Sequence, residues 1–428
     1  MTSGPHGGFD ASELCAPLGE GAPPVTVGLV VPALELGGGV PAVADFICTI
    51  ISRNARFRLR LISLSQCAID DVSVAISQPR SWLRGVQTRD GAWQGRSFLR
   101  IGSFGSELEF QRYMPRVALS NALEGCDIVQ VVAGSPAWGN AVIGLGKPVS
   151  LQVATRAKIE RLRRGTEASG PRAWWRSAMT QITDRYDDQA LRAVDAVQVE
   201  NTWMLEYART IDGVSNRTDI RYAPPGVDAK RFCPLAARSD TAKPYVLCVG
   251  RLDDPRKNIE LMLRAFKQLP DSLAHVNLVT AGVCSPSSKY WREVAACGLS
   301  GRVTHVHKPE ADTLVKLYQR ATALALPSDE EGFGMVVIEA MSCGVPVVAT
   351  RCGGPDGIIS DGKDGFLVPL NDATSMADRL SILCSDAALN LRMGQAARAT
   401  VEARYADDVA GQAFIDVWDR LLQTTGKR

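Results

Sequence analysis

Two glutamates that stand eight residues apart could bind parts of one ligand. Glu331 precedes a Phe–Gly pair at which a helix is expected to begin, and Glu339 lies inside that helix among Val, Ile, Ala and Met side chains. A helix N-terminus that follows glycine offers unpaired N–H groups and a positive dipole end, which suit an anion such as a diphosphate. A carboxylate on an apolar helix needs a polar partner. Paired ribose hydroxyls would serve, so the spacing favours a nucleotide ligand.

Two basic residues, Arg251 and Lys257, are placed where they could neutralise such a diphosphate. They follow the apolar run YVLCVG (245–250), which is expected to form a buried strand. Ligands of parallel sheets bind at the carboxyl ends of the strands. Fixed positive charge at this end would stabilise a departing diphosphate.

A second candidate loop contains glycines 37–39, after the first apolar run of the chain. The letters GGGVPA fit the G-x-G-x-x-A pattern of dinucleotide-binding folds. However, residues 32–36 separate the strand from the glycines, Pro41 lies inside the pattern, and no acid ends the next expected strand. We therefore interpret this segment as a loop whose amides, at Gly38 and Gly39, approach a phosphate or a second substrate.

Short apolar runs alternate with helical patterns over nearly the whole chain. This alternation predicts parallel sheets covered by helices on both faces. Residues 224–244, rich in Pro and in small or charged residues, divide the chain into two α/β units of similar size. A ligand would bind in the cleft between the strand ends of the two units. The expected strands are residues 25–31, 58–65, 97–101, 127–132, 148–153, 195–200, 245–250, 276–282, 302–307, 321–327 and 345–350.

Composition excludes several classes of protein. The 428 residues contain 48 basic and 46 acidic side chains, a net charge of +2, which argues against a nucleic-acid-binding protein dominated by electrostatics. The 11 cysteines form no CxxC pair and no zinc spacing, so reduced thiols in a cytoplasmic protein are expected. Residues 1–24 lack the basic and apolar regions of a signal peptide and are expected to be a flexible tail. No apolar run has the length of a membrane span.

The segment EEGFGMVVIEAMSCGVPVVAT (330–350) resembles the nucleotide-sugar-binding signature of the retaining glycosyltransferases of family 4. YVLCVGRLDDPRKNIELMLRAF (245–266) resembles the "GRL"-basic-helix element of that family. PPGVDAKRFCP (224–234) resembles its interdomain connection, and CGGPDGIISDGKDGFLVPLND (352–372) its "GGP…DGxxGxLVPxxD" region. The resemblance is strong over 224–405 and weak over 1–223.

The resemblance implies the GT-B fold, an α/β architecture of two facing Rossmann-like doubly wound parallel-sheet domains. The acceptor-binding domain would span 25–223, the donor-binding domain 224–405, and a C-terminal helix, 406–428, would return to the first domain. The implied activity is retaining transfer of a hexose from a nucleoside-diphosphate sugar to a hydroxyl by front-face substitution, with no bound metal or other cofactor. A non-catalytic sugar-nucleotide-binding paralogue and a GT-B epimerase are the alternatives.

The resemblance also assigns residues. Arg251, Lys257 and Glu331 would be catalytic, with Glu331 on the transferred sugar and Glu339 on the ribose. The remaining donor contacts would be Gly38, Gly39, Gly250, His307, Gly332, Phe333, Gly334, Met335 and Val336. His307 shares a strand face with His305, but no third ligand lies nearby in the sequence, so His307 is expected near the nucleobase and not at a metal.

One position departs from the family pattern. A histidine usually follows the strand that here reads PVSLQV, and this chain has Ala154 at that place. The departure leaves the acceptor side open and favours an altered or lost activity as the alternative. Gln152, Thr155 and Arg156 are the nearest candidates to replace the histidine.

A basic stretch in the first half could contact a membrane or a phosphorylated acceptor. Residues 156–180 hold seven Arg or Lys against two Glu, together with Trp174 and Trp175. Basic residues beside interfacial aromatics suit an anionic lipid surface, while a solvated helical face is the plainer interpretation. We expect a nucleotide sugar and a hydroxyl acceptor (a sugar, a lipid-linked sugar or a natural product) as partners, no nucleic acid, and a peripheral contact with the inner membrane face through 156–176.

Overall fold

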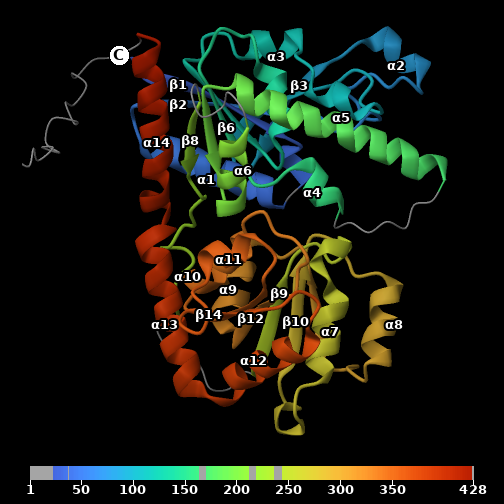
Figure 1. Cartoon of the computed structure of the whole chain (residues 1–428), viewed down its shortest axis with the longest axis vertical. Helices are drawn as coiled ribbons and strands as arrows, with labels where there is room; N and C mark the ends of the chain where they lie inside the picture. The colour runs from blue at the N-terminus through green and yellow to red at the C-terminus, as the bar shows by residue number, and fades with distance from the viewer. Residues whose placement is uncertain (1–22, 37, 163–169, 212–217, 236–242, 427–428) are drawn as a thin grey trace, which may run out of the picture.

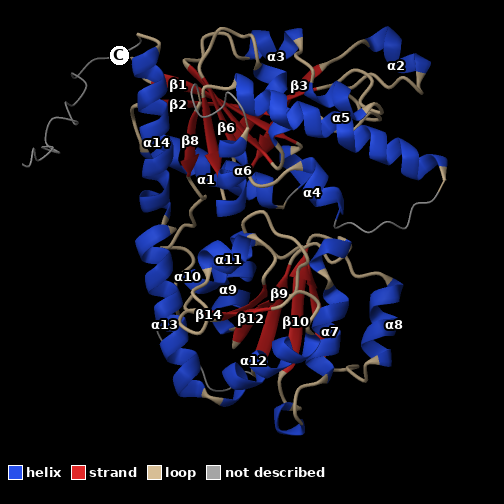
Figure 2. Ribbon diagram, in the orientation of Figure 1, coloured by secondary structure: helices blue, strands red, loops and turns tan. Residues whose placement is uncertain are grey.

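In the computed structural model, which describes residues 23–36, 38–162, 170–211, 218–235 and 243–426, the chain forms two α/β domains, one above the other in Figure 1. The expected tail lies almost wholly outside these residues. Each domain contains one sheet, and helices pack on both faces of each sheet (Figure 2). The two-domain α/β architecture expected from the sequence is confirmed.

The first sheet has eight strands in the order β3-β4-β2-β1-β5-β6-β7-β8. Its strands are β1 (Val25–Pro32), β2 (Phe57–Leu64), β3 (Thr88–Trp93), β4 (Arg96–Ile101), β5 (Ile128–Ala133), β6 (Val149–Val153), β7 (Ala196–Val199) and β8 (Asp219–Tyr222). Its helices are α1 (Gly39–Arg53), α2 (Pro79–Arg84), α3 (Val117–Ala122), α4 (Ala157–Leu162), α5 (Pro171–Ala193) and α6 (Thr202–Thr210). Short 3-10 helices are η2 (Leu34–Leu36), η3 (Glu109–Tyr113) and η4 (Pro136–Val142).

The second sheet has six parallel strands in the order β11-β10-β9-β12-β13-β14. Its strands are β9 (Tyr245–Val249), β10 (Asn277–Gly282), β11 (Val303–His307), β12 (Ala323–Leu326), β13 (Val347–Thr350) and β14 (Gly365–Val368). The helices that follow are α7 (Ile259–Lys267), α8 (Ser288–Ala296), α9 (Ala311–Arg320), α10 (Met335–Ser342), α11 (Gly354–Ile358), α12 (Ala373–Ser385), α13 (Ala387–Arg404) and α14 (Asp407–Thr424), with 3-10 helices η5 (Pro255–Lys257) and η6 (Asp271–Leu273).

The expectation of purely parallel sheets is wrong at one edge of the first sheet. Strand β3 pairs antiparallel with β4, and the two are joined by Gln94 and Gly95, both with positive φ. A two-residue turn with positive φ matches the twist of a hairpin, so it joins antiparallel neighbours. Because β3 reads TRDGAW and is mostly exposed, it lacks the apolar run that identified the other strands. Strands β8 and β14 are likewise absent from the strands expected from the sequence.

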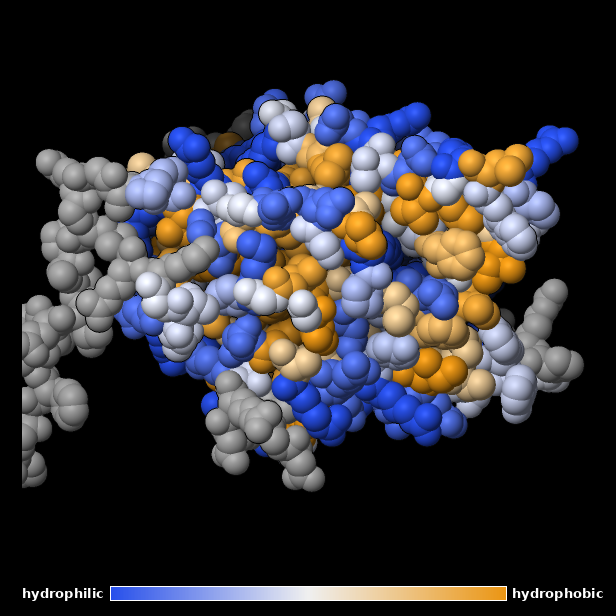
Figure 3. Space-filling model, turned by 90° about the horizontal axis from the view of Figure 1, so that it is seen from above, coloured by the Kyte–Doolittle hydropathy of each residue, from blue (hydrophilic) through white to orange (hydrophobic). Residues whose placement is uncertain are grey.

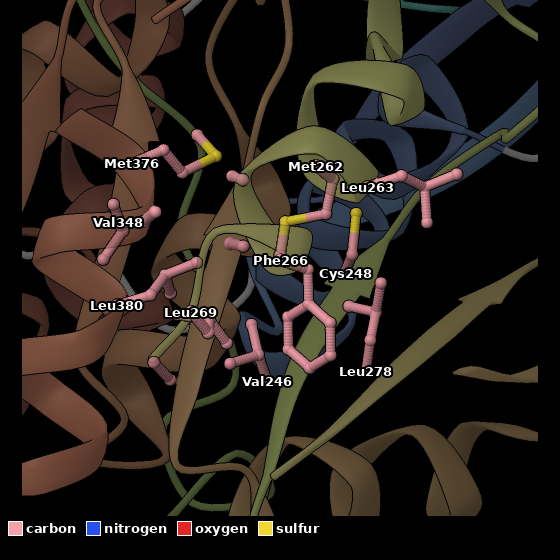
Figure 4. Close-up of a cluster of buried hydrophobic side chains, with 14 of the residues drawn as sticks. Val246, Cys248, Met262, Leu263, Phe266, Leu269, Leu278, Val348, Met376 and Leu380 are labelled. Carbon is pink, nitrogen blue, oxygen red and sulfur yellow. The ribbon is translucent and has the colours of Figure 1, made fainter. Parts of the chain in front are cut away.

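Alternate residues of the central strands supply separate cores on the two faces of each sheet. On β1, Leu29 packs with one cluster and Val30 with the other, as the period of two in a strand requires. In the second domain, Val246 and Cys248 of β9 meet Phe266 and Met262 of α7 (Figure 4). These cores hold the strand ends, and therefore the loops between the domains, in fixed positions.

The last helix, α14, packs on the first domain although it follows the second domain in the sequence (Figure 1). Phe414 stacks edge-on against Phe46 of α1, and Trp418 against Phe57 of β2. The buried indole nitrogen of Trp418 donates a hydrogen bond of 2.8 Å to Gln130 of β5. The two connections between the domains therefore run close together, and Val227 of one pairs with the segment around Ala406 of the other.

Candidate active site

The strands of the second sheet end in loops that face the first domain (Figure 2). Gly250 follows β9, and its N–H donates to the carbonyl of Ala281 in β10 at 2.9 Å. His307 ends β11, the next strand, where it pairs in register with Gly282. The ring of His307 is exposed, and its Nδ1 lies 3.2 Å from the hydroxyl of Ser285. The expected donor residues from the β9 and β11 ends thus lie in one row.

Lys257 and Glu331 form the central ion pair of this region. The Nζ atom of Lys257 lies 2.6 Å from Oε1 of Glu331, and the hydroxyl of Ser328 donates to the same oxygen at 2.7 Å. The side chains are 22% and 11% exposed, so both are partly shielded from water. The two residues stand 74 positions apart in the sequence, and both were expected at the site.

Arg251 is held by an aspartate that the sequence did not identify. Its guanidinium donates to Oδ2 of Asp254 at 3.0 Å, and Arg256 binds the same carboxylate through Nε at 3.1 Å and NH2 at 2.7 Å. Burial acts to raise the pKa of Asp254, but the hydrogen bonds and charge of Arg256, with a smaller effect of Arg251, lower it to about 2. Asp254 is therefore ionised and fixes the direction of Arg251, whose side chain is still 43% exposed.

The glycine-rich loop before α10, residues 331–334, is called the donor loop below because a sugar donor is expected there. It is held by backbone contacts on both sides. The N–H of Glu331 donates to the carbonyl of Cys352 at 3.0 Å, and the carbonyl of Glu331 accepts from the N–H of Gly354 at 2.9 Å. Gly334 caps α10 with a φ of 104°, a conformation that side-chain-bearing residues rarely adopt. Phe333 is buried, so its side chain anchors the loop, and its expected donor contact stays a prediction. The half-buried Met335 and Val336 begin the helix.

Glu339 has a protein partner that the sequence did not predict. The hydroxyl of Tyr318, a fully buried residue of α9, donates to Oε2 of Glu339 at 2.6 Å. Burial raises the pKa of Glu339, and this hydrogen bond partly offsets the rise. The inference that Glu339 requires a ribose as its partner is therefore too strong, because Tyr318 meets part of the need. Within the part of the chain that the structure describes, no hydrogen bond to the second carboxylate oxygen, Oε1, is found beside that of Tyr318 to Oε2.

The loop from β1 to α1, in the first domain, contains two of the glycines expected at the donor. Gly38 caps α1 with a φ of 103°, and nothing lies within 4 Å of a Cβ placed on Gly38 or Gly39. The open space beside both glycines fits a backbone that a ligand can approach. Gly37 lies outside the described residues.

The residues proposed to replace the missing histidine are mostly used within the first domain. Gln152 is fully buried and donates to Glu200 and to the carbonyl of Ala223, at 3.3 and 3.2 Å. Arg156 lies 2.5 Å from Asp184 and 3.8 Å above the ring of Tyr207. These internal contacts engage both side chains, and a role for either residue on the acceptor side stays a prediction.

Thr155 remains a candidate on the acceptor side. It is 6% exposed, and its hydroxyl has no hydrogen-bond partner within the described ranges. An unpaired buried hydroxyl costs free energy unless a ligand or water satisfies it. Thr155 adjoins Ala154, whose side chain packs against the donor loop: a Cβ atom on Gly332 would lie 2.6 Å from that of Ala154.

Asn201 joins the two domains at this contact. Its Nδ2 donates to the carbonyl oxygens of Ala154 and Gly332, both at 2.6 Å, and its Oδ1 accepts from Met204 N–H as the N-cap of α6. The residue is 2% exposed. Every polar atom of this side chain is therefore used, and one of its bonds reaches the donor loop. Only the capping pattern of Asn201 could have been identified in the sequence; its contact with Gly332 joins segments far apart in the chain.

Arg256 forms a second link between the domains. Its NH1 lies 2.9 Å from Glu330, beside the donor loop, and 3.1 Å from Glu160 of α4 in the first domain. With Asp254 it therefore meets three carboxylates, and it is 9% exposed. The sequence indicated Arg251 and Lys257 because of their place after β9, but nothing local distinguishes Arg256 from a surface cation.

Two further expectations concern a metal site and a contact with a membrane. In the part of the chain that the structure describes, no group of three or more His, Cys, Asp or Glu side chains is arranged to hold a metal ion. Trp174 and Trp175 lie on α5 and are 71% and 46% exposed, whereas residues 163–169 of the same basic stretch lie outside the described residues. Among the described helices none is long and apolar enough to cross a bilayer.

Comparison with other sequences identifies a family for the second domain. Residues 236–400 match the family described as Glycosyl transferases group 1. A D-inositol 3-phosphate glycosyltransferase of Xylanimonas cellulosilytica is 34% identical over 227 residues, 49% of this chain and 52% of that protein. The enzyme of the same name from an Arthrobacter strain is 31% identical over 280 residues, 61% of this chain and 63% of that protein. The chain thus spans about half to three-fifths of the length of these relatives.

Solved structures match nearly the whole chain at low identity. Sucrose-phosphate synthase from Thermosynechococcus elongatus has a TM-score of 0.71 and 19% identity, over 94% of this chain and 100% of that one. HepE of Anabaena, solved in complex with UDP-glucose, has a TM-score of 0.66 and 15% identity, over 92% of this chain and 99% of that one. These likenesses show a common fold. The resemblance stated from the sequence is confirmed: residues 236–400 form a glycosyl transferases group 1 domain, carried within a GT-B fold.

Proposed function

We propose that this chain is a retaining glycosyltransferase that moves a hexose from a nucleoside-diphosphate sugar to an acceptor hydroxyl. The observation that carries the proposal is the pairing of Lys257 with Glu331 at 2.6 Å, beside Arg251 and the N-terminus of α10, at strand ends that face the first domain. The family of the second domain supports a sugar donor. The fold shared with HepE, which was solved with UDP-glucose, supports a nucleotide sugar.

In this proposal Arg251, Lys257 and the first N–H groups of α10 bind the diphosphate. These groups are fixed before the reaction, and charge that develops on the leaving phosphate meets dipoles and cations already in place. Lys257 then lies between Glu331 and the phosphate. Because the protein supplies this positive charge, no resident metal is required by the proposal.

The transfer step is proposed as a front-face substitution. The bond from the anomeric carbon to the phosphate oxygen breaks, and a bond from that carbon to the acceptor oxygen forms on the same face. The acceptor proton passes to the leaving phosphate. Glu331 faces the sugar ring, where positive charge develops, and its carboxylate strengthens binding in the transition state. Glu339 binds the ribose through the oxygen that Tyr318 leaves available.

The acceptor side carries the alternative function. Ala154 occupies the place of the usual histidine and packs against Gly332, which favours a sugar-nucleotide-binding protein without turnover as the second candidate. The family match lies wholly within residues 236–400, so it supports the donor side of the proposal. Of the three candidates to replace the histidine, Thr155 is the one that we propose on the acceptor side.

The test begins with binding and ends with turnover. A thermal-shift screen against nucleoside diphosphates and their sugars should identify the donor, because a ligand at 100 times its Kd stabilises by about 2.7 kcal/mol. The identified donor is then incubated with sugars, polyols and D-inositol 3-phosphate. Release of nucleoside diphosphate with retention of anomeric configuration by NMR supports the proposal. Donor binding without release of the diphosphate, with or without acceptors, would establish the non-catalytic alternative.

A further inference from the structure

Two consecutive residues of η5 pair with two consecutive acids of the segment that leads to α10. The NH1 atom of Arg256 lies 2.9 Å from Oε2 of Glu330, and Nζ of Lys257 lies 2.6 Å from Oε1 of Glu331. The backbone joins the same segments, because the N–H of Asp329 donates to the carbonyl of Arg256 at 2.7 Å. Both ion pairs therefore connect the same two segments, and the position of one pair constrains the other.

Arg256 also constrains a further basic side chain of the proposed site. It donates to both oxygens of Asp254, through Nε at 3.1 Å and NH2 at 2.7 Å, and Asp254 also accepts from Arg251 at 3.0 Å. A planar guanidinium with five N–H donors can hold several carboxylates in one fixed geometry, which a flexible ammonium cannot. Arg256 therefore constrains Arg251 through Asp254, in addition to the neighbouring ion pair.

The first domain adds a third carboxylate to this guanidinium. Oε1 of Glu160, on α4, lies 3.1 Å from NH1 of Arg256, the atom that also meets Glu330. In Figure 1, α4 lies at the lower edge of the first domain, above the loops at the top of the second. Because Glu160 belongs to the other domain, this contact exists only while the two domains lie together here. The arrangement of the guanidinium therefore depends on the position of the first domain.

Burial distinguishes this contact from an ordinary surface ion pair. Hydrophilic residues are spread over the face of the first domain that points away from the second (Figure 3), and an ion pair on such a face lies in water and contributes little. The side chains of Arg256 and Glu160 are 11% and 27% exposed, and that of Glu330 is 5% exposed. Water and salt screen such charges less than they screen surface charges. The charge of Glu160 therefore contributes to the energy that holds Arg256 in place.

We propose that Arg256 is a positioning residue, through which contact with Glu160 of the first domain orders the catalytic side chains of the second. Those side chains are Arg251, Lys257 and Glu331, so the inference rests on the proposed function. Enzymes that close around a substrate exclude water from the reacting groups. A site that is fully ordered only against the first domain would spare a bound donor from hydrolysis while the domains are apart.

The experiment is amide hydrogen exchange, followed by mass spectrometry, on the full chain without any ligand. Glu160→Gln keeps the size of the side chain and removes its charge. We expect the amides of residues 251–257 and 329–334 to exchange about fivefold faster than in the wild type, because a partly exposed ion pair contributes up to about 1 kcal/mol. Both segments belong to the second domain and the substituted residue to the first, so the exchange rate reports the coupling itself. Arg256→Lys, which keeps the charge but not the planar fork, should raise exchange in the same two segments at least as much.

The matched control removes a charge from the same helix. Lys158 of α4 pairs with Asp184 of the first domain at 3.7 Å, so Lys158→Gln should leave exchange in both segments of the second domain unchanged. Wild-type exchange rates in Glu160→Gln overturn the proposal, and so does an equal increase in the control variant. Faster exchange spread evenly over all segments overturns it as well, because that result indicates a general loss of stability.

Turnover separates this inference from the proposed function. With a donor that the wild type uses, kcat/KM of Glu160→Gln should fall about fivefold, and an unchanged value would contradict a positioning role. If the wild type binds a nucleotide sugar but never releases the diphosphate, the proposed transfer fails. Exchange in the two segments, measured without a donor, still decides whether the first domain orders them.

Discussion

The side-chain amide of Asn201 lies 2.6 Å from the carbonyl oxygen of Gly332, so a residue of the first domain holds the donor loop of the second. Asn201→Asp keeps the oxygen that caps α6 but removes both N–H donors to Ala154 and Gly332. Two hydrogen bonds contribute about 1–3 kcal/mol in total. We expect kcat/KM to fall about tenfold or more.

Binding of the nucleoside diphosphate distinguishes this positioning role from general damage. The proposed diphosphate contacts, Arg251, Lys257 and the N-terminus of α10, lie in the second domain, so calorimetry should give nearly the wild-type Kd for Asn201→Asp. Equal losses in kcat/KM and in nucleotide affinity would contradict the role assigned to Asn201. A wild-type kcat/KM would contradict it as well.

Glu331→Gln should lower kcat without weakening nucleoside-diphosphate binding. The glutamate is proposed to act in the transition state, and its removal also frees Lys257 from the ion pair. A hydrogen bond to a charged group contributes roughly 1.5–3 kcal/mol, so kcat should fall about 10- to 150-fold. Ser328→Ala, which removes only the hydroxyl bonded to the same oxygen, is the matched control and should have a small effect. Steady-state kinetics and calorimetry decide; loss of nucleotide affinity in Glu331→Gln would reverse the assignment.

Glu339→Gln should weaken the free nucleoside diphosphate and raise the donor KM, with little change in kcat. Ribose contacts hardly change as the glycosidic bond breaks, so they contribute uniform binding. Tyr318→Phe is the informative companion. The Tyr318 hydrogen bond lowers the pKa of Glu339, so its removal raises that pKa, and nucleotide affinity should then be lost at a higher pH as the solution is acidified. A pH profile of calorimetric affinity identical to wild type would exclude this coupling.

Excess EDTA should leave turnover unchanged. The diphosphate charge is proposed to be met by Arg251, Lys257 and the N-terminus of α10, so chelation removes nothing that the step uses. The assay compares initial rates with and without EDTA, and then after addition of Mg²⁺ or Mn²⁺. Activity lost in EDTA and restored by either ion would refute a metal-independent reaction.

Glu200→Gln should stabilise the protein above neutral pH. Burial raises the pKa of Glu200 from 4.5 to about 7, although the hydrogen bond from Gln152 acts in the opposite direction. The folded state therefore binds more protons than the unfolded state between these values, so stability falls as pH rises through this window and is level above it. The full shift corresponds to about 3 kcal/mol, which the variant should recover at pH 8. Glu206→Gln, on the exposed face of α6, is the control; equal urea midpoints for both variants would contradict the prediction.

The fold could be predicted where a strand is an apolar run that ends in a recognisable loop. Such runs identified β1 and β9 to within a residue or two, because strands buried on both faces are continuously apolar. Strand β3 could not be found in this way. Its pairing depends on the hairpin turn at Gln94 and Gly95, and its side chains are largely exposed.

Residues of the candidate site could be predicted where they belong to one sequence motif. Contacts between segments that are far apart in the chain could not be predicted. Glu331 and Glu339 share a loop and a helix, so their spacing was informative. Tyr318 reaches Glu339 from another helix, and Glu160 reaches Arg256 from another domain. Such pairs depend on the tertiary packing of elements, which neither propensity nor spacing encodes.

Because helix α14 comes last in the chain, the core of the first domain can be completed only at the end of synthesis. Phe414 and Trp418 fill the core of the domain whose strands leave the ribosome first, yet they are translated after the whole of the second domain. During synthesis, the apolar surface that α14 covers therefore stays exposed on the first sheet until the second domain has emerged. Such surface is what chaperones bind. A message truncated after α13 would yield a chain with an open core, subject to proteolysis, and not an independent acceptor domain.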